Sequence, residues 1–347
     1  MGRRGSRLNL SVVGWAADSG VGRELIEAAR HLPVSSAFIL SNPTKPTRRD
    51  LVTIPCFMSS GTALVVEMKA FIDKHKPDTI LTWEVPGSWD FPALWASKGI
   101  RWVHMVHWDW FARDRKSIWK RAELLAPNRM CQAALKEQCL LESTLLPVPV
   151  DTDRFAFKLR KKADHFVSIY AYGGSHERRS LMEIFDAWGG LEKPPPLTIF
   201  AQKKPPELDE LKPVPGIEVL LGNAPDPWML YETGDVSVQM SRYEGVGVSL
   251  LEAQSCGLPV VSINAPPMDE ITPDLNVAIR KMVAIEIMGK ELTSYIPSVE
   301  SLRERIASIQ GQDIKELSLK ARERVEKDYS WKVLRPRWME VLEGAAS

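Results

Sequence analysis

Two glutamates flank a glycine-rich turn in the second half of the chain. Glu244 opens the sequence EGVG, and Glu252 follows within a predicted helix over residues 248–256. The backbone amides of residues 245–248 would point out of the N-terminus of that helix, where unpaired N–H groups and the helix dipole favour an anion such as a diphosphate. Carboxylates accept hydrogen bonds from hydroxyl groups. Taken singly, either glutamate is explained by a solvated charge, but together they suit a ligand with phosphates and hydroxyls.

A second group of reactive side chains lies in the run WVHMVHWDWF of the first half. His107 follows a predicted strand over residues 102–106 and can face a ligand, whereas His104 within the strand is expected in the core. Asp109 is a candidate hydrogen-bonding partner for His107 or for an acceptor hydroxyl group. His107 and Asp109 are therefore candidate functional residues of the first half.

Tryptophans and basic residues interleave between Trp83 and Arg121. Most tryptophans of a domain belong to its core, but a tryptophan at a cleft can stack on a sugar or on an unpaired base. The cations suit an anionic partner. The predicted acceptor-side residues are Trp83, Trp108, Trp110, Arg113 and Lys116, with Glu270 from the later loop PPMDE.

The elements that must position these residues follow an α/β pattern, because short apolar runs alternate with segments of helical period. A proline-containing run over 145–164 separates two such series. The pattern predicts two doubly wound, Rossmann-like domains, 1–157 and 158–330, and an amphipathic last helix over 331–347 that packs against a domain. Ligands of such sheets bind beyond the carboxyl ends of the strands, so the site is expected in a central cleft between the domains. Strands are predicted at 8–13, 37–40, 79–83, 102–106, 145–148, 166–171, 197–201, 217–221, 235–240 and 260–263, and helices at 22–32, 62–74, 131–137, 180–188 and 248–256.

Composition limits the class of protein. The 347 residues exceed what one hydrophobic core usually supports, and no apolar run approaches the ~20 residues that cross a bilayer. The four cysteines lack a Cys-x-x-Cys spacing, which predicts reduced thiols, a cytoplasmic location and no metal site. Residues 1–150 carry 20 basic and 14 acidic side chains, or +6, and the remainder carries 25 and 30, or −5. The first half therefore either meets an anionic partner or has a chance excess of surface cations.

The segment around Glu244 resembles the signature of retaining nucleotide-sugar glycosyltransferases with the GT-B fold, in particular glycosyltransferase family 4. The resemblance rests on EGVG, on LLEA around Glu252 and on GLPVV at 257–261, and it extends over nearly the whole chain. It implies that Glu244 contacts the transferred sugar, that Glu252 contacts the donor ribose and that His107 lies near the sugar and the acceptor. The predicted catalytic residues are therefore His107, Glu244 and Asp109. The resemblance also implies that the last helix, 331–347, packs back on the first domain. The implied donor-binding residues are Gly20, Gly22, Arg178, Arg179, Gly245, Val246, Gly247, Val248 and Glu252.

The cations that would bind the donor phosphates depart from the family pattern. Where the family has an arginine and, five residues later, a lysine, this sequence has Gly174 and Arg179. Arg179 can replace the lysine and Arg178 the missing arginine, since a guanidinium binds phosphate oxygens through two bonds. A surface position for Arg178 is the alternative. The loop around Gly20 lacks the third glycine of a dinucleotide fingerprint, which disfavours NAD binding.

The resemblance implies a retaining hexosyl- or pentosyltransferase that needs no metal and no cofactor and takes a UDP- or GDP-sugar as donor. Three roles stay open. The first is transfer to a hydroxymethylated pyrimidine of bacteriophage DNA in the host cytoplasm, with double-stranded DNA as partner. The second is transfer to a glycan or lipid of a cell envelope, with peripheral membrane contact. The third is a non-enzymatic nucleotide-sugar-binding protein, against which the two glutamates count.

Overall fold

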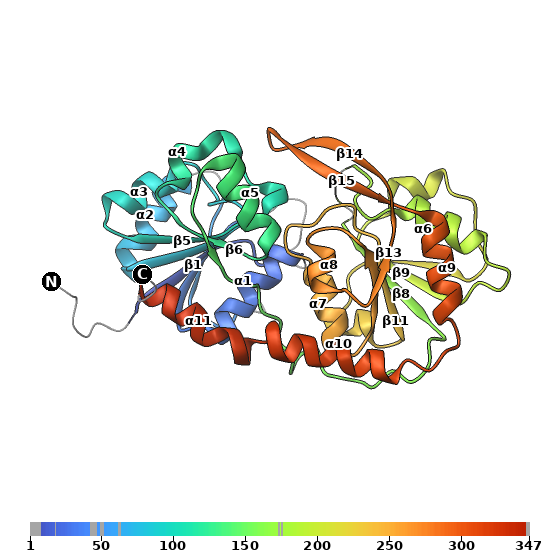
Figure 1. The fold of residues 1–347 in the computed structure, drawn as a ribbon. Coiled ribbons are helices and arrows are strands. Elements are labelled where there is room, and N and C mark those ends of the chain that lie inside the picture. Colours follow the sequence, from blue (N-terminus) through green and yellow to red (C-terminus); the bar gives the residue numbers. More distant parts are fainter. Residues whose placement is uncertain are drawn as a thin grey trace. The chain divides into compact units, whose positions relative to one another are not determined.

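The computed structural model describes residues 8–17, 19–41, 47–48, 52–61, 64–172, 174 and 176–344. The chain folds into two compact units (Figure 1). Unit 1 comprises the chain up to Val148 together with the chain from Leu334 onward, and unit 2 comprises Pro149–Val333.

Unit 1 is built on a parallel sheet whose strand order is β3-β2-β1-β4-β5-β6-β7. This is the doubly wound order in which the direction of strand addition reverses between β1 and β4. The central strands are fully buried, as their continuous apolar runs predict. The strands are β1 Leu10–Gly14, β2 Val34–Ile39, β3 Cys56–Met58, β4 Thr79–Trp83, β5 Arg101–Met105, β6 Glu123–Ala126 and β7 Thr144–Leu145.

Side-chain caps set where the main helices of unit 1 begin. The hydroxyl of Ser19 accepts from the N–H of Gly22 at 3.3 Å, and the side chain of Asn128 accepts from the N–H of Cys131 at 2.9 Å. The helices are α1 Gly20–His31, α2 Leu64–His75, α3 Phe91–Ser97, α4 Lys116–Trp119 and α5 Arg129–Cys139, with 3₁₀ turns η2 Trp108–Trp110 and η3 Arg113–Arg115.

The last helix, α11 Trp331–Glu343, contributes its residues from Leu334 onward to unit 1. The guanidinium of Arg101, at the start of β5, donates to the carbonyl oxygen of Leu342 at 2.7 Å. The indole N–H of the buried Trp338 donates to the carbonyl oxygen of Pro147 at 3.3 Å. These bonds hold the end of the chain against the first sheet.

Unit 2 repeats the doubly wound order, with strands in the order β10-β9-β8-β11-β12-β13 and the reversal between β8 and β11. Helices α6 and α9 cover one face of the sheet, and α7 and α10 cover the other (Figure 1). The strands are β8 Phe166–Ala171, β9 Leu197–Ala201, β10 Ile217–Leu221, β11 Val236–Gln239, β12 Val260–Ile263 and β13 Leu275–Val277. The helices are α6 Leu181–Gly189, α7 Val248–Ser255, α8 Met268–Ile271, α9 Val299–Ile309 and α10 Lys315–Asp328, with turns η4 Pro206–Asp209 and η5 Pro227–Tyr231.

An antiparallel hairpin, absent from the sequence prediction, interrupts the parallel pattern of unit 2. Its strands are β14 Ile279–Ile287 and β15 Lys290–Pro297, which form the long orange ribbon of Figure 1. The N–H of Tyr295 donates to the carbonyl oxygen of Arg242 at 2.8 Å, so the hairpin is tied to the loop that follows β11.

The predicted fold of two doubly wound, Rossmann-like domains is confirmed. The predicted elements recur with shifted ends, while β3, β6, β13, α3, α4, α8, α9, α10 and the hairpin strands β14 and β15 were not predicted. No described helix is both long and apolar enough to span a bilayer.

Candidate functional site

A buried charge cluster lies at the carboxyl edge of the sheet in unit 2, where the strand order reverses. Arg178 and Arg179 come from the loop after β8, and Glu244 comes from the loop after β11. Both guanidinium groups donate to the carboxylate of Glu244, and Arg179 also donates to the hydroxyl of Ser241 at 2.6 Å. Ligands of doubly wound sheets bind at this kind of reversal point, so the cluster is a candidate anion site.

The two arginines keep Glu244 ionised. Burial by itself would raise the pKa of this carboxyl, but Arg178 and Arg179 outweigh burial and lower the pKa to about 2. Arg178 also lies over the ring of Tyr243, 5.0 Å from its centroid. The site therefore holds two cations against one anion at neutral pH.

Gly174 explains how Arg178 reaches this position. A Cβ atom built on Gly174 would lie 2.8 Å from Cδ of Arg178, and its φ of +103° also favours glycine. Gly174 therefore leaves room for the Arg178 side chain, at the position where the family pattern has an arginine. The alternative of a surface position for Arg178 is wrong, because its side chain is mostly buried against Glu244.

Arg242 holds the arginine-bearing loop, and sequence reasoning missed it. Its buried guanidinium donates to both oxygens of Glu183 at 2.8 and 3.0 Å, and it pairs with Glu177 at 2.7 Å. Its backbone N–H donates to the carbonyl oxygen of Arg178 at 2.8 Å. Glu177 and Ser180 have φ near +50°, a strained region for residues other than glycine. Arg242 compensates for this strain with bonds that the sequence spacing does not reveal.

The turn before α7 requires glycine at one position. Gly247 has a φ of +82° and precedes the helix, and a Cβ there would lie 2.9 Å from Leu250 and 3.1 Å from Ile271. Gly245 and Val246 are buried beside it, and Val248 is half-buried. The predicted turn and helix N-terminus are therefore present next to Glu244.

Glu252 already has a protein partner. Its side chain is 1 % exposed, and the hydroxyl of Tyr231, at the end of η5, donates to its carboxylate at 2.8 Å. No pattern in the sequence pointed to Tyr231. The contact of Glu252 with a donor ribose stays a prediction, and it would require the ligand to reach a buried carboxylate.

A second buried ion pair lies in unit 1. Nε2 of His107, directly after β5, lies 3.0 and 3.1 Å from the two carboxylate oxygens of Glu24 on α1. Burial would lower the pKa of His107, but the charges of Glu24, Glu84 and Asp109 and the hydrogen bond to Glu24 raise it to about 9. His107 is thus an imidazolium ion at neutral pH. Glu24, unnoticed in the sequence, is the partner of Nε2, and Asp109 acts on His107 through its charge. The contact of Asp109 with an acceptor hydroxyl group stays a prediction.

The two glycines of the first loop have different roles. Gly20 is exposed at the start of α1. Gly22 is buried, and a Cβ there would lie 2.2 Å from the carbonyl oxygen of Ala17. The N–H of Gly22 is bonded to Ser19. Gly22 therefore lets α1 pack against the preceding loop, and its expected role in approaching the donor phosphates stays a prediction.

The aromatic part of the predicted acceptor side is largely core. Trp83 and Trp108 are each 2 % exposed, and Trp108 stacks on Phe111 with ring centroids 5.7 Å apart. Neither ring is free to stack on a ligand, which corrects their assignment. Trp110 is 45 % exposed, and its neighbours Arg113 and Lys116 are exposed and half-buried, respectively. Glu270, also assigned to the acceptor side, is half-buried in α8 of unit 2.

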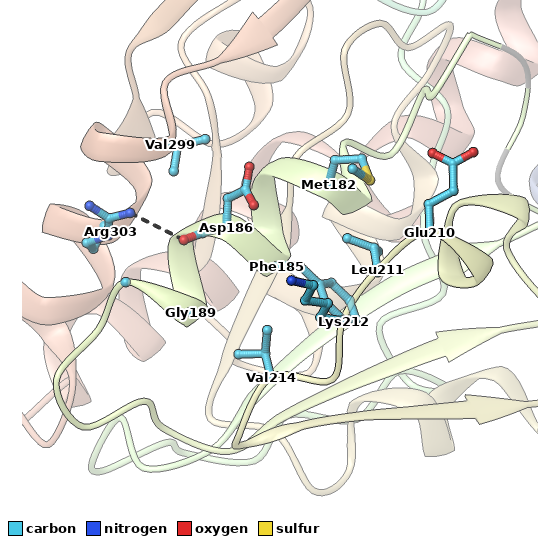
Figure 2. Close-up of a pocket in the computed structure, with 11 residues that line it drawn as sticks. Met182, Phe185, Asp186, Gly189, Glu210, Leu211, Lys212, Val214, Val299 and Arg303 are labelled. Atoms are coloured by element: carbon cyan, nitrogen blue, oxygen red, sulfur yellow. Dashed lines mark hydrogen bonds between the residues drawn. The ribbon is translucent and has the colours of Figure 1, made fainter.

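A surface groove in unit 2 contains none of the predicted site residues. Figure 2 shows it between α6, α9 and the segment 210–214, with a volume of about 700 Å³. Phe185 and Leu211 form part of its apolar floor, and Arg303 on its rim donates to the carbonyl oxygen of Asp186 at 3.3 Å. The charge cluster around Glu244 is therefore separate from this groove.

The same two-domain fold occurs in solved glycosyltransferase structures. A glycosyltransferase from Rickettsia africae superposes with a TM-score of 0.74 at 16 % identity, over 98 % of this chain and 99 % of the other. Sucrose-phosphate synthase from Thermosynechococcus elongatus gives 0.72 at 16 % identity, over 98 % and 100 %. The Anabaena protein Alr3699/HepE, in complex with UDP and glucose, gives 0.71 at 14 % identity, over 97 % and 100 %. The fold is that of GT-B glycosyltransferases.

The comparison of sequences also supports a glycosyltransferase, but over a shorter part of the chain. Residues 213–286 match the family described as glycosyl transferases group 1. This range contains Glu244 and Glu252, but not Arg178, Arg179 or any residue of unit 1. No curated protein matches the chain in sequence at a significant level. The fold and this segment together support a glycosyltransferase.

Proposed function

We propose that the protein is a retaining glycosyltransferase that moves a sugar from a UDP- or GDP-sugar to an acceptor hydroxyl. The observation that carries the proposal is the buried cluster of Arg178, Arg179 and Glu244 at the strand-order reversal of unit 2. The group 1 match over residues 213–286 supports it, as does the likeness to Alr3699/HepE, which was solved with UDP and glucose.

In this proposal the arginines bind the donor diphosphate. Guanidinium groups bind phosphate oxygens in a bidentate manner, and the N-terminus of α7 adds backbone dipoles. Together they stabilise the negative charge that grows on the leaving phosphate. When the diphosphate takes the guanidinium groups, Glu244 is left to accept hydrogen bonds from the sugar hydroxyls.

Retention and independence from metal are parts of the same proposal. The acceptor hydroxyl attacks the face from which the diphosphate leaves, and a leaving phosphate oxygen takes the hydroxyl proton. The guanidinium groups of Arg178 and Arg179 would then neutralise the charge that a metal ion neutralises in other transferases.

For the acceptor we propose an anionic molecule that meets the exposed segment around Trp110 and Arg113. DNA that carries hydroxymethylated pyrimidines is the first acceptor to test. The burial of Trp83 and Trp108 leaves Trp110 as the exposed tryptophan of the predicted set, so a pocket for an extruded base would depend on it. A cell-envelope glycan or lipid is the second acceptor, because the same cations suit anionic headgroups.

A thermal-shift screen with UDP- and GDP-sugars in EDTA tests the donor proposal. A ligand at 100 times its Kd stabilises the folded state by about 2.7 kcal/mol, which gives a readily measured rise in Tm. The proposal fails if no nucleotide sugar at millimolar concentration raises the Tm. A shift that appears only after Mg²⁺ or Mn²⁺ is added would overturn the metal-independent part alone.

A further inference from the structure

The ring of His107 is engaged on one side only. Its Nε2 lies against both oxygens of Glu24, and the two side chains are 8 % and 3 % exposed. Among the residues that the structure describes, none accepts a hydrogen bond from Nδ1 of His107. The ring therefore has Nε2 bound to Glu24, and its Nδ1 has no acceptor among the described residues.

We propose that Glu24 is a positioning residue, which fixes the His107 ring through Nε2 and leaves its Nδ1–H as a cationic hydrogen-bond donor to the substrate. The identity of that substrate rests on the proposed glycosyl transfer. The pairing of Glu24 with His107 does not depend on it.

The start of α1 sets the position of Glu24. Ser19 caps the helix, and Gly22 packs against the carbonyl oxygen of Ala17, where any side chain would collide. These two constraints fix where the helix begins against the preceding loop. Glu24 lies two residues after Gly22, in the first turn and a half of the helix, and is thereby held at the carboxyl end of β5.

The charges around His107 come from four elements. Glu24 on α1, Glu84 after β4 and Asp109 on η2 all favour the protonated ring. His104 on β5 is buried, and burial and the charge of His107 hold its pKa well below the usual range. Nδ1 of His104 is hydrogen-bonded to the hydroxyl of Thr82 at 2.7 Å. His104 is thus neutral, and His107 carries the positive charge of the pair.

This arrangement sets what His107 can do in the reaction. An imidazolium ion cannot accept the proton of an acceptor hydroxyl at neutral pH, so His107 is not a general base there. It can donate a charge-assisted hydrogen bond to a substrate oxygen, where a fixed donor in a water-poor site stabilises developing negative charge.

The titration of His107 followed by NMR tests the pairing directly. In the wild-type protein the ring should titrate near pH 9. Glu24→Gln should lower that value by roughly 1–3 pH units, the usual effect of removing a charge partner. Glu27→Gln is the matched control, because Glu27 is a buried carboxylate of the same helix that instead faces Arg30 and His31. It should leave the titration of His107 unchanged.

A wild-type titration near pH 6.5 would overturn the proposal without any variant. So would a Glu24→Gln protein that titrates like the wild type. Because the carboxylate is buried, Glu24→Asp serves as a second variant if Glu24→Gln folds poorly. In Glu24→Asp the pKa of His107 should stay raised, because a carboxylate remains beside the ring.

The pH dependence of kcat tests the catalytic part. If Glu24→Gln lowers the titration of His107 from about 9 to about 7, the protonated fraction at pH 8 falls about tenfold. The value of kcat should fall by a similar factor at pH 8 and recover towards pH 6, with a smaller change in the KM of the donor. A pH-independent loss would show that Glu24 acts on the fold alone. If the titrations shift as expected but no nucleotide sugar is bound or cleaved, the pairing stands and the proposed function fails.

Discussion

Units 1 and 2 share one strand order, but they hold buried charges of opposite sign at the carboxyl edges of their sheets. In unit 1 a cation, His107, is held by the carboxylate of Glu24. In unit 2 a carboxylate, Glu244, is held by Arg178 and Arg179. A buried charge is tolerated only when it is paired. The same scaffold therefore supports either sign of charge, and local partners determine which one.

The two clusters also differ in how many charges they bring. Unit 2 places two guanidinium groups against one carboxylate, so it has cationic capacity that an entering anion can use. Unit 1 places three carboxylates near one imidazolium ion. This difference is consistent with the proposed binding of the donor diphosphate in unit 2 and with the proposed hydrogen bond from His107 in unit 1.

The largest expected effect comes from removing the cations of unit 2. Replacing Arg178 and Arg179 together by Gln leaves Glu244 buried and unpaired, which costs about 3–5 kcal/mol of stability. Donor binding should be lost with it. Urea unfolding and calorimetric titration with UDP-glucose measure the two effects.

A third substitution separates charge from packing in this cluster. Adding Glu244→Gln to the double variant should restore part of the stability, because it removes the unpaired charge. It should not restore donor binding. If the triple variant is no more stable than the double variant, the destabilisation comes from packing and not from the ion pairs.

The stabilities of the two units should respond to pH in opposite directions, because the buried charges of Glu244 and His107 have opposite signs. Glu244 has a folded pKa of about 2 against 4.5, so its contribution is present above pH 4.5 and is lost as the pH falls towards 2. His107 has a folded pKa of about 9 against 6.5, so its contribution is present below pH 6.5 and is lost as the pH rises through 9. Each shift of about 2.5 pKa units corresponds to roughly 3–4 kcal/mol.

Hydrogen exchange of peptides from each unit measures these responses separately. Protection around β11 should decrease in acid, and protection around β5 should decrease in alkali. Glu244→Gln and Glu24→Gln should each flatten the response of its own unit only. Loss of protection in both units at the same end of the pH range would contradict the comparison.

A smaller effect is expected at Glu252, whose carboxylate accepts a hydrogen bond from the hydroxyl of Tyr231. Tyr231→Phe removes the hydrogen bond from a buried carboxylate and should destabilise unit 2 by about 1–3 kcal/mol. Glu252→Gln should weaken donor binding more than Tyr231→Phe does, if the carboxylate reaches the ribose. Donor titrations of the two variants decide this, and equal affinities would place Glu252 outside the donor site.

The sequence predicted the features that local patterns encode. Strand β11 alternates valine with polar residues, and the turn around Gly247 lies between this strand and a helix, so the surroundings of Glu244 followed from neighbouring residues. The pairing of Glu24 with His107 joins residues that are 83 positions apart, and the bonds of Arg242 to Glu183 span 59. No periodicity reports such contacts, because they depend on how the strands are ordered in space.

The hairpin of unit 2 lacks the usual sequence signal. Its two-residue turn consists of Met288 and Gly289, with φ values of +52° and +70°. Turns of this type usually carry Asn-Gly or Asp-Gly, and methionine is unusual where φ is positive. The many tryptophans of unit 1 are visible in the sequence, but their number does not show which rings are buried. Trp108 belongs to the core, whereas Trp110 is exposed.

The smallest effect on the fold is expected from the exposed cations of unit 1, which would sharpen the division of roles between the units. Arg113→Glu with Lys116→Glu should change stability by less than about 0.5 kcal/mol, because Arg113 is exposed and Lys116 is only half-buried. Donor hydrolysis should stay unchanged, since the donor is assigned to unit 2. Transfer of labelled sugar to an anionic acceptor should be lost, and acceptor binding by the wild type should weaken steeply with salt.

Duplexes that contain hydroxymethylcytosine or hydroxymethyluracil, compared with anionic lipid vesicles that carry glycan acceptors, identify the acceptor. Label on the lipid or glycan alone would reject DNA, and undiminished transfer by the double variant would remove the segment around Trp110 from the acceptor site.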